Sequence, residues 1–259
     1  TGSRKQLYIN GVLVADAAYT GGIASTSYPV VIGGDAESTD RTLQGVVDSV
    51  RIWSLARTGE ELNGMATEYL RGSEPGLIGD WRLNENAGVV ALDNSAGARN
   101  GTLNIGKPSS GSGSLPQRVN GLALEPPADG PFGLFFNNRT SQYASFPGLT
   151  PVTSLQSLEL PLPSPAQKFD FQQGLSAEFW IKPQAIPVSG GVVVVTKGSS
   201  AWEVTYRETG KIVFHTSGVQ STAAGGGSTE LISKARVEPR EWTHVTVIWN
   251  PVENEKRIY

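Results

Sequence analysis

The chain has 259 residues, enough to bury a substantial hydrophobic core as one large β domain or as two domains of average size. Its 21 lysines and arginines and 24 aspartates and glutamates give a formal charge of −3, and no basic block interrupts the sequence, which argues against nucleic acid and anionic membrane surfaces as partners. The absence of cysteine excludes disulfides, zinc thiolate sites and cysteine nucleophiles.

Short runs of β-branched and aromatic residues separated by turn residues predict a mainly β protein, and 31 glycines and 16 prolines supply the turns. No apolar run approaches the roughly 20 residues that span a bilayer, so we expect no membrane insertion. Near the start, Asn10 and Gly11 separate two apolar runs, and this dipeptide tolerates positive φ at both central turn positions. It predicts a β-hairpin, and Val30–Ile32 predicts another strand.

Residues 46–53 ("VVDSVRIW") predict a longer strand. Simple alternation places Val46, Asp48, Val50 and Ile52 on one face and the remaining four residues on the other. Because each face then holds both apolar and polar groups, we expect burial on both sides for part of this strand.

One short amphipathic helix follows that strand. Thr58 and Glu61 have the spacing of a capping box. Apolar residues then recur at helical spacing before Gly72 and Pro75 end the helix: Leu62, Met65, Ala66 and Tyr69. We expect this helix to lie across a sheet or at its edge.

Further strands are predicted from Gly76 and over residues 175–181, 192–196, 202–206, 211–215 and 242–249. Residues 104–115 and 149–168 are predicted to be loops, and residues 218–231 a flexible crossing, since they are rich in glycine, serine or proline without periodicity. Many short strands with little helix are typical of a β-sandwich or jelly roll.

The order of several motifs resembles a laminin G-like domain of the concanavalin A-like lectin and glucanase superfamily. The stretches from residue 76 onward are "GLIGDWRLNENAGVVALDNSAGARNGTL", "LFFNNRTSQYASF", "LSAEFWIKP", "VVTKG", "REWTHVTVIWN" and "KRIY", and the earlier ones are "KQLYINGVLVA", "VVIGG" and "LQGVVDSVRIWSLARTGEEL". The resemblance implies an all-β fold, an antiparallel jelly-roll β-sandwich (concanavalin A-like) with one short helix.

The two halves of this pattern occur in reversed order. Residues 1–71 resemble the family's carboxyl-terminal half, residues 72–75 read as a linker, and residues 76–259 resemble its amino-terminal part. Residues 256–259 nearly repeat residues 5–8. This fits a segment of a tandem-repeat protein that starts in the middle of one repeat and ends at the same point of the next, out of phase with the repeat boundaries. Two arrangements remain open: the halves belong to successive repeats, or they close on each other as one circularly permuted sandwich.

Catalysis is not expected. A glycosidase of this superfamily needs two facing carboxylates, whereas the strand acids Asp48, Glu178 and Glu203 are isolated in the sequence. His215 and His244 lie within predicted strands, and no serine nucleophile motif accompanies them.

Calcium is the one cofactor that the resemblance leaves open. Related domains bind it at the rim of the sandwich through carboxylate, amide and carbonyl oxygens. The candidate metal ligands here are Asp48, Glu85, Asp93 and Asn137.

Ligands in this superfamily usually meet the rim loops or one sheet face, and loops often carry function. Trp53, Trp81, Trp180 and Trp242 match core aromatic positions of the family, so we predict that they pack. The candidate ligand-binding residues are therefore Trp202, Tyr206 and Tyr143 on predicted strands and Asp35, Asp40 and Arg41 in a rim loop, with residues 218–229 as a second loop to consider.

These features together predict a non-catalytic binding or adhesion module of a large extracellular or cell-surface protein. Its expected partners are a glycan or extracellular protein ligand and neighbouring repeats of the same chain. A structural spacer repeat in a surface fibre or adhesin is the alternative, and a glycoside hydrolase is a third reading. Nothing in the sequence separates recognition from spacing, because fold does not fix function.

Overall fold

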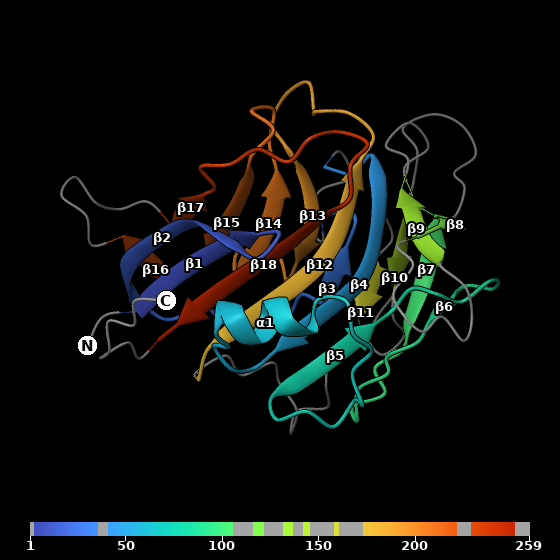
Figure 1. The fold of residues 1–259 in the computed structure, drawn as a ribbon, viewed down its shortest axis with the longest axis horizontal. Helices are drawn as coiled ribbons and strands as arrows, with labels where there is room; N and C mark the ends of the chain where they lie inside the picture. Colours follow the sequence, from blue (N-terminus) through green and yellow to red (C-terminus); the bar gives the residue numbers. More distant parts are fainter. Residues whose placement is uncertain are drawn as a thin grey trace.

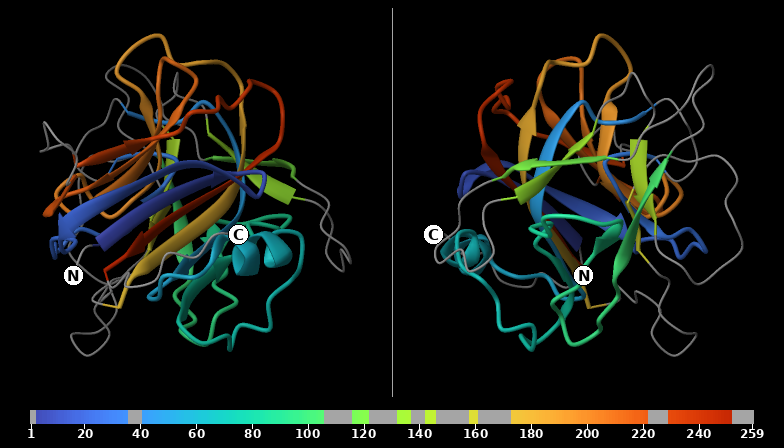
Figure 2. Two further views of the ribbon diagram at one scale, coloured as in Figure 1. Left: turned by 60° about the vertical axis from the view of Figure 1, so that its left-hand side comes forward. Right: turned by 90° about the vertical axis from the view of Figure 1, so that its right-hand side faces the viewer.

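Two antiparallel β-sheets pack face to face, and one short helix lies on the outside of the sandwich (Figures 1 and 2). The computed structural model describes residues 3–35, 41–105, 116–121, 132–136, 142–145, 158–160, 173–221 and 229–251. The architecture confirms the predicted antiparallel β-sandwich. None of the helices in these ranges is long and apolar enough to cross a membrane.

Sheet A has nine strands. In spatial order they are β16 (Val219–Ser221), β2 (Val12–Gly21), β1 (Ser3–Ile9), β18 (Thr243–Asn250), β12 (Leu175–Pro183), β4 (Gly45–Trp53), β9 (Phe132–Phe136) and β8 (Gln117–Asn120), while β5 (Leu77–Trp81) pairs with β4.

Sheet B also has nine strands. In spatial order they are β10 (Gln142–Ser145), β7 (Gly101–Ile105), β11 (Leu158–Leu160), β3 (Val30–Ile32), β13 (Val192–Thr196), β14 (Trp202–Tyr206), β15 (Ile212–Thr216) and β17 (Glu230–Ile232), while β6 (Val90–Ala91) pairs with β7. Strands β11 and β16 and the first two residues of β17 fall in segments predicted to be loops or a flexible crossing, because three-residue strands leave little periodicity to detect.

The predicted hairpin at Asn10 and Gly11 is present between β1 and β2. Both turn residues have positive φ, 50° and 75°, the backbone that favours this dipeptide. On its other side β1 pairs with β18, with Lys5 opposite Trp249. Residues 256–259, which nearly repeat residues 5–8, lie outside the described residues.

Strands from the first 53 residues lie among strands from the last part of the chain. In sheet A, β1 lies between β2 and β18, and β4 lies between β12 and β9. In sheet B, β3 lies between β11 and β13. The two stretches that resemble opposite halves of the family pattern thus complete the same sheets in this structure.

The long strand β4 contains a β-bulge that changes its predicted faces. Between its pairs with Glu178 and Trp180 of β12, β4 has one residue more than its partner, and Ser49 has a φ of 51°. The extra residue resets the alternation, so Val47, Val50 and Ile52 pack in the core between the sheets. The placement of Val46, Asp48, Val50 and Ile52 on one face is therefore wrong.

The predicted helix is α1 (Gly59–Met65), and its capping box is present. The Thr58 side chain accepts a hydrogen bond from the Glu61 backbone N–H, and the Glu61 carboxylate accepts one from the Thr58 backbone N–H. On the outer face of sheet A, α1 contributes Leu62 to a second hydrophobic cluster with Trp53, Leu70 and Ile248. The helix therefore covers a part of sheet A that faces away from the main core (Figure 1).

Candidate ligand-binding face

The outer face of sheet B carries a row of polar side chains. On β14, Trp202, Val204 and Tyr206 pack into the core, so Glu203 and Thr205 point to the other side of the sheet. The strand register sets Glu203 opposite His215 of β15, and His215 opposite Glu230 of β17. One row of side chains across three strands thus contains two carboxylates and an imidazole.

Arg41 joins this row to the rim loop after β3. Its Nη1 donates to Asp35 Oδ2 and to Glu203 Oε2, each at 3.0 Å, and its Nη2 donates to Glu203 Oε1 at 2.9 Å. The Arg41 side chain is 25% exposed, whereas those of Asp35 and Glu203 are 2% and 6% exposed. Burial lowers the pKa of Arg41, but the hydrogen bonds and charges of Glu203 and Asp35 outweigh this and raise it. The guanidinium therefore stays charged and fixed.

The backbone holds Arg41 in place. The Val193 N–H donates to the Arg41 carbonyl at 2.9 Å, and the Leu43 N–H donates to the Gly33 carbonyl at the same distance. Gly33 has a φ of 81°, and a Cβ there would come within 2.5 Å of the Phe136 ring. Glycine is thus required where the chain leaves β3 and turns toward Arg41.

A second arginine lies over the same face. Arg207 Nε donates to Thr205 Oγ1 at 3.0 Å, and Nη2 donates to Glu230 Oε1 at 2.7 Å. His215 lies 3.1 Å through Nε2 from the Ser199 carbonyl and 2.9 Å through Nδ1 from Thr229 Oγ1. Because a carbonyl only accepts, His215 Nε2 is the donor in the contact with Ser199.

We call this surface the charged face and define it by Arg41, Glu203, Arg207, His215 and Glu230. Each of its glutamates is paired with an arginine, and both guanidiniums are about a quarter exposed. A guanidinium with free N–H groups binds hydroxyl and carboxylate oxygens directionally. Hydrolysis of a glycoside needs an acid and a base that are both free to act, whereas both glutamates of this face are held by arginines. The partly exposed guanidiniums therefore suit the binding of a polar ligand.

Two predicted ligand residues, Asp35 and Arg41, are brought together at this face. Trp202 and Tyr206 have 0% exposed surface, and the Tyr206 hydroxyl donates to the Val237 carbonyl at 3.0 Å, so neither ring faces a ligand in this structure. Tyr143 lies on β10, at the far edge of sheet B from β14. Asp40 lies outside the described residues.

The predicted metal ligands are not brought together. Asp48 is buried on β4 and accepts a hydrogen bond from the Ser49 hydroxyl, while Glu85 is paired with Arg118 at 2.7 Å. The Asp93 carboxylate already accepts four hydrogen bonds, from the N–H groups of Asp80, Ser95 and Arg99 and from the Ser95 hydroxyl. Asn137 lies outside the described residues. Within the described ranges no group of three or more His, Cys, Asp or Glu residues could hold a metal ion, and calcium binding stays a prediction.

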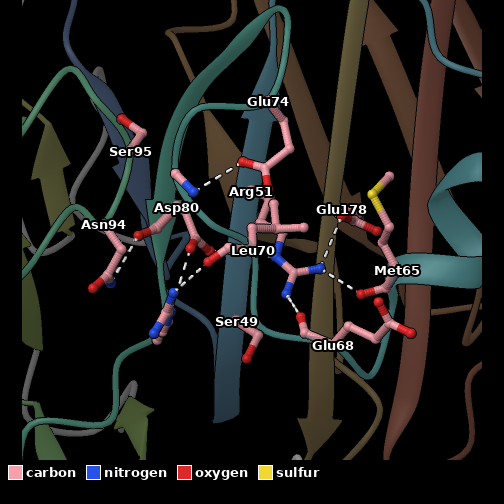
Figure 3. Close-up of polar contacts among 12 residues, drawn as sticks. Ser49, Arg51, Met65, Glu68, Leu70, Glu74, Asp80, Asn94, Ser95 and Glu178 are labelled. Atoms are coloured by element: carbon pink, nitrogen blue, oxygen red, sulfur yellow. Dashed lines mark hydrogen bonds and ion pairs between the residues drawn. The ribbon is translucent and has the colours of Figure 1, made fainter.

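The outer face of sheet A also has an arginine between carboxylates, but this arginine is buried against the carboxyl end of α1 and the turn that follows it. Arg51 lies 3.3 Å from both Asp80 and Glu178, and it donates to the carbonyls of Met65, the last residue of α1, and of Glu68 beyond it (Figure 3). Burial raises the pKa of Asp80, against the opposing charge of Arg51 and Arg82. No basic residue lies in the last turn of α1, so Arg51 supplies the positive charge that the helix carboxyl end favours.

Sequence reasoning missed Arg207, His215 and Glu230 as members of the charged face. Alternation along β14 is the signal that could have identified Glu203, because Trp202, Val204 and Tyr206 on the opposite face fill the core. The pairing with Arg41 was not visible, since it joins residues 162 positions apart.

Comparison with known proteins gives one family. The family model Laminin_G_3, described as the concanavalin A-like lectin/glucanases superfamily, matches residues 1–63 and 157–259, which together are more than half of the chain. No curated protein and no solved structure gave a match. The two matched segments include β1 to β4 and β12 to β18, the strands that complete one another in both sheets. The chain therefore belongs to the laminin G-like family of the concanavalin A-like lectin/glucanases superfamily.

Proposed function

We propose that the chain is a non-catalytic binding module that recognises a glycan or a protein ligand through the charged face. The single observation behind this proposal is the Arg41 cluster, in which a partly exposed guanidinium is held by two buried carboxylates. Such preorganisation lowers the entropy cost of binding. The laminin G-like family is generally non-catalytic, which supports the same conclusion.

The proposal places the module in a large extracellular or cell-surface protein, where its neighbours are repeats of the same kind. Family membership supports this setting, since laminin G-like domains are typically extracellular. The strand pairing supports a further part of the proposal, that the two halves close as one permuted sandwich. The pairs of β1 with β18 and of β4 with β12 bury the edges that half a sandwich would leave open.

Glycan-array binding tests the proposed function. We expect saturable binding by the wild-type chain, and a loss of at least tenfold in affinity for Arg41→Ala. Arg4→Ala is the matched control, because Arg4 forms an ion pair of similar exposure with Asp16 on sheet A. Repeating the measurement with a chelator tests the calcium prediction.

Three results would contradict the proposal. Equal loss in both arginine variants would show that the charged face is not the binding surface. A null array with unchanged melting after calcium removal would contradict the glycan part of the proposal and favour the spacer repeat. Release of reducing sugar from β-glucans would establish the glycosidase. Thermal unfolding of residues 1–259 tests closure separately, since a single sandwich unfolds in one cooperative transition.

A further inference from the structure

Lys5 is a fully buried cation inside the sandwich. It lies on β1 with 0% exposed surface, and its Nζ donates to the Thr229 carbonyl at 2.5 Å. The same atom lies 4.1 Å from the centroid of the Tyr19 ring and 5.4 Å from that of Phe214. Tyr19 belongs to sheet A and Phe214 to sheet B, so the ammonium lies between the sheets.

This ammonium has no carboxylate within 4.0 Å in the described part of the chain. Burial lowers the pKa of Lys5 to about 7, and the charge of Glu230 on β17 opposes this effect. Tyr19 on β2 is the other titratable group that faces it, while Phe214 of β15 and Trp249 of β18 carry no charge. Buried charges are normally paired, and the Glu230 carboxylate is bound to Arg207 instead.

Among the described residues, three more hydrogen-bonding groups at this end of the core have no partner. They are Ser3 Oγ, Thr216 Oγ1 and Trp249 Nε1, in residues that are 5%, 0% and 2% exposed. Trp249 is the cross-strand neighbour of Lys5, and Ser3 precedes Lys5 by two residues on the same face of β1. The Thr216 N–H donates to the same Thr229 carbonyl that Lys5 uses, at 3.1 Å.

Donors exceed acceptors in this group of residues. The ammonium has three N–H bonds and, in the described part of the chain, one acceptor, the Thr229 carbonyl, while the indole N–H of Trp249 has none. The hydroxyls of Ser3 and Thr216 can each donate as well as accept, and neither makes a hydrogen bond within the described residues. The Thr229 carbonyl already receives two hydrogen bonds, from Lys5 and from the Thr216 backbone. Leaving buried donors unpaired costs stability, so the chemistry of the site calls for an acceptor with negative charge.

We propose that this end of the core, the Lys5 site of Ser3, Lys5, Thr216 and Trp249, binds one small monovalent anion such as chloride. The anion pairs with the ammonium and accepts hydrogen bonds from the surrounding hydroxyl and indole groups. A single positive charge matches a single negative charge, which disfavours sulfate and larger polyanions. The site lies on the inner side of the sheets, so it is separate from the charged face.

Bromide is the probe, because its anomalous scattering locates it in a crystal. We expect crystals of residues 1–259 soaked in sodium bromide to show an anomalous peak within about 3.5 Å of Lys5 Nζ, the range of a hydrogen bond to a halide. In solution at pH 6, where Lys5 is protonated, Tm is expected to be about 3 °C higher in sodium bromide than in sodium gluconate of equal ionic strength.

Two variants separate the site from general salt effects. Lys5→Met keeps the length and the apolar stem, and it should abolish the Tm difference between the two salts. Thr216→Val should reduce that difference. An equal difference in Lys5→Met, or no bromide peak at the site together with equal Tm values, overturns the proposal. Should Lys5→Met fail to fold, the bromide peak in the wild-type crystal decides.

Discussion

The outer faces of the two sheets use the same chemistry in different surroundings. Each has an arginine between two carboxylates: Arg51 with Asp80 and Glu178 on sheet A, and Arg41 with Asp35 and Glu203 on sheet B. The Arg51 side chain is 2% exposed against the carboxyl end of α1 and the turn after it, whereas that of Arg41 is 25% exposed. The two clusters contain the same types of side chain, so their different solvent exposure is what separates a structural cluster from a candidate binding surface.

The difference follows from how far each guanidinium is already engaged in hydrogen bonds and how much of it solvent can reach. Arg51 uses Nε, Nη1 and Nη2 on two carboxylates and on the carbonyls of Met65 and Glu68. Arg41 directs Nη1 and Nη2 to its carboxylates and keeps part of its surface in solvent. The first arrangement stabilises the fold, and the second can exchange water for ligand oxygens.

Arg51→Ala breaks the comparison most strongly. It removes one cationic partner from each of the buried carboxylates Asp80 and Glu178, which keep only Arg82 and His244 beside them in the described part of the chain. It also removes the donors to the carbonyls at the carboxyl end of α1, so we expect the free energy of unfolding to fall by about 3–5 kcal/mol. Urea unfolding followed by tryptophan fluorescence measures the change. Arg4→Ala, at an exposed pair, should cost less than about 1 kcal/mol. A loss as small as that for Arg51→Ala would show that the cluster under α1 is not structural.

Stability measured over a pH series extends the comparison to Lys5, a buried cation with no carboxylate within 4.0 Å in the described part of the chain. The pKa of Lys5 is lowered to about 7 in the folded chain from 10.5, so the unfolded chain binds more protons between these pH values. Stability in dilute buffer should therefore rise from pH 7 to pH 9. Lys197, whose pKa is lowered by burial to about 8, acts in the same direction.

Urea unfolding at pH 7, 8 and 9 gives the slope, and Lys5→Met should flatten it. The upper limit avoids the tyrosines, because burial raises the pKa of Tyr19 and of Tyr206 to about 12 and the two residues would oppose the trend above pH 10. Stability that falls between pH 7 and pH 9 would contradict the burial of an unpaired ammonium.

Arg41→Ala tests the other side of the comparison. Because this guanidinium is partly exposed, its loss should lower the free energy of unfolding by only about 1–2 kcal/mol while removing ligand binding. Circular dichroism and urea unfolding measure the fold and its stability. A loss as large as that for Arg51→Ala would mean that the charged face is mainly structural.

Thr58→Ala has the smallest expected effect. It removes the cap of α1 while leaving Arg51 in place, and typical losses for such caps are about 1 kcal/mol. Thermal unfolding is the measurement, and Ser73→Ala in the following turn serves as a control with no helix cap to lose. An unchanged Tm for Thr58→Ala would show that packing of Leu62 alone retains the helix on sheet A.

Local signals in the sequence predicted much of the fold. The Asn10-Gly11 turn, the Thr58 to Glu61 capping box and the long strands β4, β12 and β18 each have short-range chemistry that determines their structure. The faces of β4 were predicted wrongly because a bulge at Ser49 leaves no distinct pattern in one sequence. Short strands such as β11 and β17 depend on pairing with distant partners, which local patterns do not contain.

The candidate site was harder to predict because its contacts are long-range. Asp35 and Arg41 were identified as rim-loop residues, but their partner Glu203 comes from another strand. Trp202 and Tyr206 were chosen as freely placed aromatics, and strand alternation sends both into the core. The register of β14, β15 and β17 aligns Glu203, His215 and Glu230, and that register exists only in the folded sheet.

Because early and late strands alternate within both sheets, the chain is suited to fragment complementation. Seven backbone register pairs join β12 to β4, and six join β1 to β18, so a cut after α1, such as at Ser73, would leave both fragments holding parts of the same sheets. Neither fragment alone would cover its edges. Expressed as two separate polypeptides, the fragments should associate and fold into one sandwich. Formation of the folded complex would then show that the two fragments have bound each other.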